Sequence, residues 1–107
     1  MKIFHIIGQP GSGKTTLVAD LVQVLCRENI SVGTIKHSAH AYELDKPGKD
    51  SFLHRKAGAA PAAMMTRDLA AVYLPRSSDM TPATLIEHYY SHLDVVLIEG
   101  WISGPYD

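Results

Sequence analysis

The 107-residue sequence has a single cysteine, almost no imbalance of charge and no long apolar run. Because a disulfide needs two cysteines, Cys26 alone excludes an internal bridge. Ten basic and eleven acidic side chains give a formal net charge of -1, so the chain has neither the basic excess of a nucleic-acid-binding surface nor an acidic tail. No apolar stretch has the length of about 20 residues that a membrane-spanning helix needs. These features indicate one cytoplasmic domain over residues 1–107 that binds neither nucleic acid nor membranes.

A glycine-rich turn follows the short apolar run near the start of the chain. Residues 3–16 read IFHIIGQPGSGKTT, and their spacing is that of the complete Walker A pattern. The glycines let backbone N–H groups approach phosphate oxygens, and the helix that begins near Gly13 directs its positive end at the same anion. The pattern therefore predicts nucleotide binding, rather than a strand-to-helix turn without a ligand. The predicted cofactor-binding residues are Gly8, Gln9, Pro10, Gly11, Ser12, Gly13, Lys14, Thr15 and Thr16.

Three side chains of this turn have distinct expected roles. Lys14 is a mobile positive charge that can reach the β- and γ-phosphates, so it is a candidate catalytic residue. The hydroxyl of Thr15 is a candidate Mg²⁺ ligand. We expect Thr16 to contact the α-phosphate.

The rest of the chain alternates between strand and helix patterns, which predicts an α/β fold of three layers with a mostly parallel sheet. Residues 30–35 and 94–98 predict strands, and the apolar run of the second is typical of a strand covered on both faces. Residues 62–66 and 70–74 predict two strands joined tightly, as in a β-hairpin, although AAPAAMM is also compatible with a helix. The predicted helices are one with an apolar face formed by Leu17, Leu21, Val24 and Leu25, a short one from Asp50 or Ser51 to about Ala57, and one from Thr81 and Pro82 to about His92.

An acidic residue ends the last apolar strand. In VVLIEG, Glu99 follows four apolar residues and Gly100 allows the chain to turn away. Asp94 would lie about 17 Å back along the strand, too far to share a metal ion with Glu99. We therefore expect Glu99 to hold Mg²⁺ through a water molecule or to polarise an attacking water. The alternative is a solvated carboxylate at a strand end.

A second polar group follows the strand at residues 30–35. Lys36 and His37 come directly after this strand, and the loop AYELDKPGKDS then brings Asp45 and Asp50. Ligands of parallel α/β sheets bind at the carboxyl ends of the strands. This loop is therefore a candidate switch or substrate loop beside the phosphate site.

The six histidines raise the alternative of a transition-metal site. His37 and His40 are close in sequence, and His88 and His92 are four residues apart on a predicted helix, a spacing that can place two imidazoles on one face. Neither pair has a nearby cysteine or a third obvious ligand. We expect the first pair to line the crevice and the second to form a solvated helix face.

Four stretches of the chain together resemble the MobB family, the small P-loop accessory proteins of molybdopterin guanine dinucleotide biosynthesis. They are IIGQPGSGKTTL at 6–17, GTIKHSAH at 33–40, DKPGKDSFLHRKAGAA at 45–60 and DVVLIEGW at 94–101. The resemblance implies binding of GTP and Mg²⁺, weak GTP hydrolysis, and support for the guanylyltransferase that joins GMP to the molybdenum cofactor. It implies that Thr15, Glu99 and Asp45 hold the metal. The residues implied to line the crevice are Lys36, His37, Asp45, Lys49 and Asp50.

Members of this family usually continue for several dozen residues past the VVLIEG strand, so the resemblance implies that the C-terminal part of the fold is missing here. The sequence contains no Asn-Lys-x-Asp motif for reading guanine, and the choice of GTP follows from the resemblance alone. An incomplete sheet would leave a bare strand edge or an apolar face, which favours a homodimer, as in similar proteins.

Three other functions are compatible with the sequence. One is a small-molecule P-loop kinase that holds its acceptor near His37 and Asp50, and a second is a metallochaperone GTPase of the nickel-insertion type. The third is a non-catalytic protein that keeps the phosphate loop without a complete site.

Overall fold

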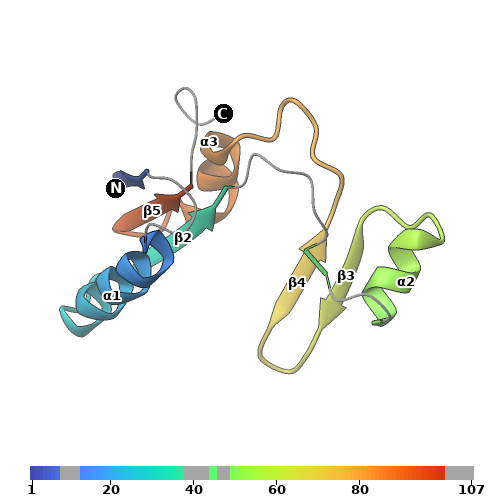
Figure 1. Cartoon of the computed structure of the whole chain (residues 1–107), viewed down its shortest axis with the longest axis horizontal. Coiled ribbons are helices and arrows are strands. Elements are labelled where there is room, and N and C mark those ends of the chain that lie inside the picture. Colours follow the sequence, from blue (N-terminus) through green and yellow to red (C-terminus); the bar gives the residue numbers. More distant parts are fainter. Residues whose placement is uncertain (8–12, 38–43, 46–48, 101–107) are drawn as a thin grey trace. The chain divides into compact units, whose positions relative to one another are not determined.

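The computed structural model describes residues 1–7, 13–37, 44–45 and 49–100. The chain divides into two compact units, Met1–His40 with Asp79–Asp107 and Ala41–Ser78. The expectation of a single nucleotide-binding domain over the whole chain stays a prediction. In chain order the elements shown in Figure 1 are β1 (Lys2–Ile6), α1 (Lys14–Arg27), β2 (Val32–Lys36), α2 (Asp50–Lys56), β3 (Ala62–Met65), β4 (Ala70–Tyr73), α3 (Pro82–Leu85), η1 (Ile86–Tyr90) and β5 (Val95–Glu99).

The larger unit is built on a parallel sheet of three strands in the order β1, β5, β2. Every residue of the central strand β5 is buried. Val95 and Leu97 pack with α1 on one face of the sheet, and Val96 and Ile98 pack with η1 on the other. The continuous apolar run therefore forms a strand covered on both faces, as predicted. The predicted three-layer α/β fold with a parallel sheet is confirmed.

Helix α1 buries a different face from the predicted one. Of the four residues predicted to form the apolar face, only Leu25 packs against the core, and the other three are between 36% and 53% exposed. The residues that α1 packs against the sheet are Val18, Val22 and Leu25. Both sets have helical spacing, and the position of α1 over β5 and β2 decides which set is buried. The prediction of the apolar face was therefore wrong for Leu17, Leu21 and Val24.

The helix predicted after residue 80 changes its type along its length. Thr81 caps α3, because its hydroxyl accepts a hydrogen bond from the N–H of Thr84 while the Thr84 hydroxyl accepts one from the N–H of Thr81. After Leu85 the helix continues as the π-helical segment η1. In η1, the Tyr90 hydroxyl donates a hydrogen bond to the carbonyl oxygen of Thr34 at 2.8 Å, and burial raises the pKa of Tyr90. This bond ties η1 to β2.

The smaller unit consists of a β-hairpin and one helix. Strands β3 and β4 pair antiparallel, with Ala62 opposite Tyr73, so the predicted hairpin is confirmed. Helix α2 contacts β3, and the guanidinium of Arg55 lies 5.4 Å from the centroid of the Tyr73 ring. The N-cap of α2 is Lys49, one residue before the first of the two alternative caps predicted, Asp50 and Ser51.

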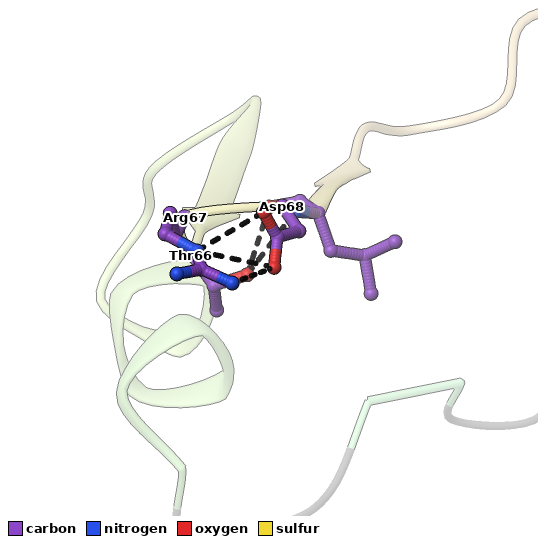
Figure 2. A network of polar contacts seen from close by, with 4 residues as sticks. Thr66, Arg67 and Asp68 are labelled. Carbon is purple, nitrogen blue, oxygen red and sulfur yellow. Dashed lines mark hydrogen bonds and ion pairs between the residues drawn. The ribbon is translucent and has the colours of Figure 1, made fainter.

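The turn of the hairpin is closed by its own polar groups, as Figure 2 shows for Thr66, Arg67 and Asp68. The N–H of Thr66 donates to the carbonyl oxygen of Leu69 at 2.8 Å, and the N–H of Leu69 donates to the Thr66 hydroxyl at 3.1 Å. Arg67 and Asp68 form an ion pair at 3.0 Å. Because both charged side chains are largely exposed, this pair adds little to stability.

The amino-terminal ends of β2 and β5 are joined by a serine and an aspartate. The backbone N–H and the hydroxyl of Ser31 donate to Oδ2 of Asp94, at 3.0 and 2.9 Å. The N–H of Asp94 donates in return to the Ser31 hydroxyl oxygen at 2.8 Å. The bonds from Ser31 favour the charged carboxylate and lower the pKa of Asp94. Asp94 thus lies directly before β5, one residue outside the strand where the sequence placed it, and acts there as a structural residue.

Replacing Asp94 with asparagine is expected to reduce stability at neutral pH, with a loss that shrinks in acid. Since the pKa of Asp94 is lower in the folded chain, its stabilisation is present above the unfolded value of about 3.9. This stabilisation is lost as the pH falls through the lowered folded value. Urea unfolding of both chains between pH 7 and pH 2 measures the difference. Asp20→Asn, on the exposed side of α1, is the matched control. If Asp94→Asn lost the same unfolding free energy at every pH, the charge of Asp94 would have no role in stability.

Candidate functional site

Three polar residues meet at the carboxyl end of the parallel sheet. Glu99 is the last residue of β5 and lies opposite Lys36 in the register of β2. Paired residues of neighbouring strands project from the same face of a sheet. Glu99 and Leu97 are two residues apart in β5, so both side chains project from the face that α1 covers. The first turn of α1 brings Thr15 to the same place. The fold therefore brings together three side chains that are far apart in sequence.

The hydroxyl of Thr15 connects the two charged side chains. Its Oγ1 donates a hydrogen bond to Oε1 of Glu99 at 2.5 Å and accepts one from Nζ of Lys36 at 3.5 Å. The first distance is that of a charge-assisted O–H···O⁻ bond. Glu99 is only 5% exposed, and a buried carboxylate needs such a partner. The alternative of a solvated carboxylate at the strand end is therefore wrong.

Backbone contacts hold this end of the sheet together. The N–H of His37 donates to the carbonyl oxygen of Glu99 at 2.7 Å, and the N–H of Gly100 donates to the carbonyl oxygen of Ile6 at 3.2 Å. Gly100 has a φ of 133°, a conformation that favours glycine. As predicted, Gly100 lets the chain turn directly after Glu99.

Gly100→Ala is expected to destabilise the fold, because a Cβ at this position would overlap the carbonyl oxygen of His37. Rotation of a side chain cannot relieve a clash with the backbone. Overpacking and the positive φ together predict a loss of about 2–5 kcal/mol in the free energy of unfolding, measured by chemical denaturation.

Gly58→Ala is the matched control for this substitution. Gly58 also has a positive φ, 118°, but nothing lies within 4 Å of a Cβ built there. Its replacement should cost only the conformational strain of about 1–2 kcal/mol. Equal losses in the two variants would show that the contact with His37 has no energetic effect.

The described part of the predicted phosphate loop begins at Gly13. Gly13 is the N-cap of α1 with a φ of 88°, a conformation that favours glycine. Lys14 is the first residue of the helix and is partly buried, while Thr15 and Thr16 are exposed. The predicted residues that lie outside the described ranges are Gly8, Gln9, Pro10, Gly11 and Ser12.

The other predicted crevice residues belong to the smaller unit. Oδ2 of Asp45 accepts a hydrogen bond from the Ser51 hydroxyl at 2.5 Å, and Ser51 is 5% exposed. Lys49 and Asp50 are exposed at the start of α2. The role of these residues in a nucleotide site stays a prediction. The sequence suggested Ser51 only as a helix cap, since no local signal marks a serine that is buried against a carboxylate six residues away.

The oxygen atoms of Thr15 and Glu99 are of the kind that Mg²⁺ prefers. Mg²⁺ usually binds one or two carboxylates together with substrate phosphates and water, so a hydroxyl and a carboxylate already 2.5 Å apart fit the protein's share of such a site. Among residues 1–7, 13–37, 44–45 and 49–100, no three His, Cys, Asp or Glu side chains come together as a metal site. His88 and His92 are exposed, as predicted, and His40 lies outside these ranges.

The helices of the described part of the chain are all too short or too polar to cross a membrane.

The sequence matches the profile of the family described as "Molybdopterin guanine dinucleotide synthesis protein B", MobB, over residues 3–107. It is 39% identical over 94 residues to the molybdopterin-guanine dinucleotide biosynthesis adapter protein of Escherichia coli K12. This alignment covers 85% of this chain and 54% of that protein. The adapter protein of Haemophilus influenzae is 35% identical over 104 residues, covering 96% of this chain and 58% of that protein. The chain thus spans little more than half the length of these relatives.

Solved structures show the same likeness. The crystal structure of Bacillus subtilis MobB superposes with a TM-score of 0.78 at 29% identity and covers 99% of this chain and 64% of that one. A MobB homolog from Bacillus stearothermophilus gives a TM-score of 0.67 at 27% identity over 99% of this chain and 60% of that one.

Proposed function

Because the chain belongs to the MobB family, we propose that it is a GTP-binding adapter in the biosynthesis of molybdopterin guanine dinucleotide. The names of its relatives from Escherichia coli and Haemophilus influenzae support the adapter role. In this proposal it acts in the cytoplasm as a homodimer, and its partners are the guanylyltransferase and other proteins of the molybdopterin pathway. GTP is bound with Mg²⁺ and hydrolysed slowly.

The hydrogen bond between Thr15 and Glu99 is the observation that carries the nucleotide-binding part of the proposal. P-loop proteins hold Mg²⁺ with the Ser or Thr that follows the Walker A lysine and with a carboxylate of the Walker B strand. Here the hydroxyl of Thr15, the residue after Lys14, donates a hydrogen bond to the buried carboxylate of Glu99, which ends the central strand β5. The fold therefore places both groups of such a site next to each other.

Each residue then has a role that follows from its place. Lys14, at the positive end of α1, would pair with the β- and γ-phosphates. The oxygen of Thr15 still has a lone pair for Mg²⁺ while its proton is shared with Glu99. Glu99 would hold the metal ion, directly or through water, and orient the water that attacks the γ-phosphate. The predicted roles of Gly13 and Thr16 at the phosphates complete the described part of this site.

Calorimetric titration of the whole chain with a slowly hydrolysed GTP analogue and its ATP counterpart, both with Mg²⁺, tests the proposal. Selective binding of the GTP analogue would support it in full. Equal binding of both would support the phosphate site and contradict guanine selectivity within these residues. Failure to bind either nucleotide would contradict nucleotide binding altogether.

The homodimer is tested separately by light scattering at micromolar concentration. A mass of two chains is expected, because β1 and β2 are the edge strands of the sheet in the described part of the chain, and an edge strand can pair with a second copy. A single monomeric species would count against this part of the proposal without affecting nucleotide binding.

A further inference from the structure

Lys36 places its ammonium beside the hydroxyl of Thr15, which is proposed to bind Mg²⁺. Its Nζ lies 3.5 Å from Oγ1 of Thr15, and Thr15 donates its proton to Glu99. The hydroxyl oxygen has two lone pairs in all, and the ammonium is directed at one of them. A cation on the same oxygen would be a close neighbour of this ammonium, and two positive charges so close repel each other strongly.

We propose that Lys36 makes the binding of a divalent cation at Thr15 and Glu99 conditional on a bound polyphosphate. This inference rests on the proposed nucleotide-binding function and adds a determinant of ligand specificity to it. The ammonium opposes a metal ion that arrives alone. A triphosphate supplies oxygens with which the ammonium can pair instead, so the repulsion is replaced by attraction to the same ligand.

The fold suits Lys36 to this role. Its backbone is held in β2 by the register with Glu99 and by the neighbouring bond from the His37 N–H to the Glu99 carbonyl oxygen. Its side chain is exposed, and four flexible methylene groups let the ammonium move from Thr15 to a phosphate at little cost. A fixed backbone and a mobile ammonium therefore allow Lys36 to respond to a bound ligand.

The coupling is reciprocal, because any group that makes the metal depend on the nucleotide also makes the nucleotide depend on the metal. Without the ammonium, Thr15 and Glu99 should bind a divalent cation better on their own. The gain in affinity on adding a triphosphate should then be smaller. Both effects concern binding and can be measured without any turnover.

Electron paramagnetic resonance of Mn²⁺, used as the probe for the Mg²⁺ site, tests the inference on the full chain. Mn²⁺ is titrated with and without a slowly hydrolysed GTP analogue into the wild type and three variants. Lys36→Met removes the charge and keeps the stem, and Lys36→Arg keeps the charge. Lys2→Met is the matched control, because Lys2 is an exposed lysine of the same sheet at its opposite end, paired with Val95.

Lys36→Met is expected to bind Mn²⁺ about tenfold more tightly than the wild type without nucleotide. The increase in Mn²⁺ affinity caused by the GTP analogue should fall by a similar factor. Lys36→Arg and Lys2→Met should both behave as the wild type does. Circular dichroism on the same samples shows that the variants are folded, as expected for substitutions of exposed side chains.

Two arms of the experiment separate the inference from the proposed function. Unchanged Mn²⁺ affinity of Lys36→Met without nucleotide would overturn the inference, and so would an equal gain in Lys36→Arg, which keeps the charge. A wild-type chain whose Mn²⁺ affinity does not rise with the GTP analogue would overturn the proposed function, and the inference with it.

Discussion

Lys14→Ala is expected to weaken binding of a GTP analogue by between about 30-fold and several thousandfold while leaving the fold intact. Removal of one partner from a desolvated, hydrogen-bonded charge pair costs about 2–5 kcal/mol, which corresponds to that range of affinity. Lys14 begins α1 directly after the left-handed Gly13, where its ammonium and the helix N-terminus would act on the same phosphates. Calorimetric titration in the presence of Mg²⁺ measures the loss.

The fold should survive because the substitution removes no core side chain. The residues that α1 packs against β5 begin at Val18, one turn later, and alanine is the best helix former. Lys2→Ala is the matched control for the loss of a positive charge from the same unit. Wild-type affinity in the Lys14 variant would refute the assignment of residues 8–16 as a phosphate loop.

Glu99→Gln is expected to retain most nucleotide binding and to lose Mg²⁺-dependent hydrolysis. Glutamine has the shape of glutamate, and its amide oxygen can still accept the hydrogen bond from Thr15, so no buried polar group loses its partner. The variant lacks the negative charge that would hold Mg²⁺ and orient the attacking water. Loss of a group that polarises the attacking water and assists its deprotonation slows a reaction by about 10²–10⁴-fold. Phosphate release from GTP under single-turnover conditions would detect such a loss.

Two further variants decide where the effect comes from. Asp20→Asn removes an exposed acidic charge from α1 and should leave hydrolysis unchanged. If hydrolysis survives in Glu99→Gln, another carboxylate has the role, and Asp45 or Asp50 then becomes the candidate. The corresponding asparagine variants would show the loss instead.

The sequence by itself determined those features that depend on local backbone geometry. The Walker A spacing predicted a helix that begins near Gly13, and Gly13 is the N-cap of α1, with a φ of 88°. The apolar run before Glu99 predicted a strand covered on both faces, and every residue of β5 is buried. The pattern of residues 62–74 predicted a hairpin, which β3 and β4 form. Each of these depends on neighbours within a few positions, where residue type and spacing largely decide the conformation.

Only the tertiary structure decided which groups of different elements meet. Leu17, Leu21 and Val24 have the same helical spacing as the residues that α1 buries, so the sequence could not tell which face packs on the sheet. Thr15 and Glu99 are 84 positions apart, and their contact depends on the strand order β1, β5, β2 and on where α1 crosses it. The sequence predicted that Lys36 lies near a nucleotide, but its link to the Thr15 hydroxyl follows from the register that pairs it with Glu99. Such contacts result from the packing of whole elements against one another, which no local pattern of residues encodes.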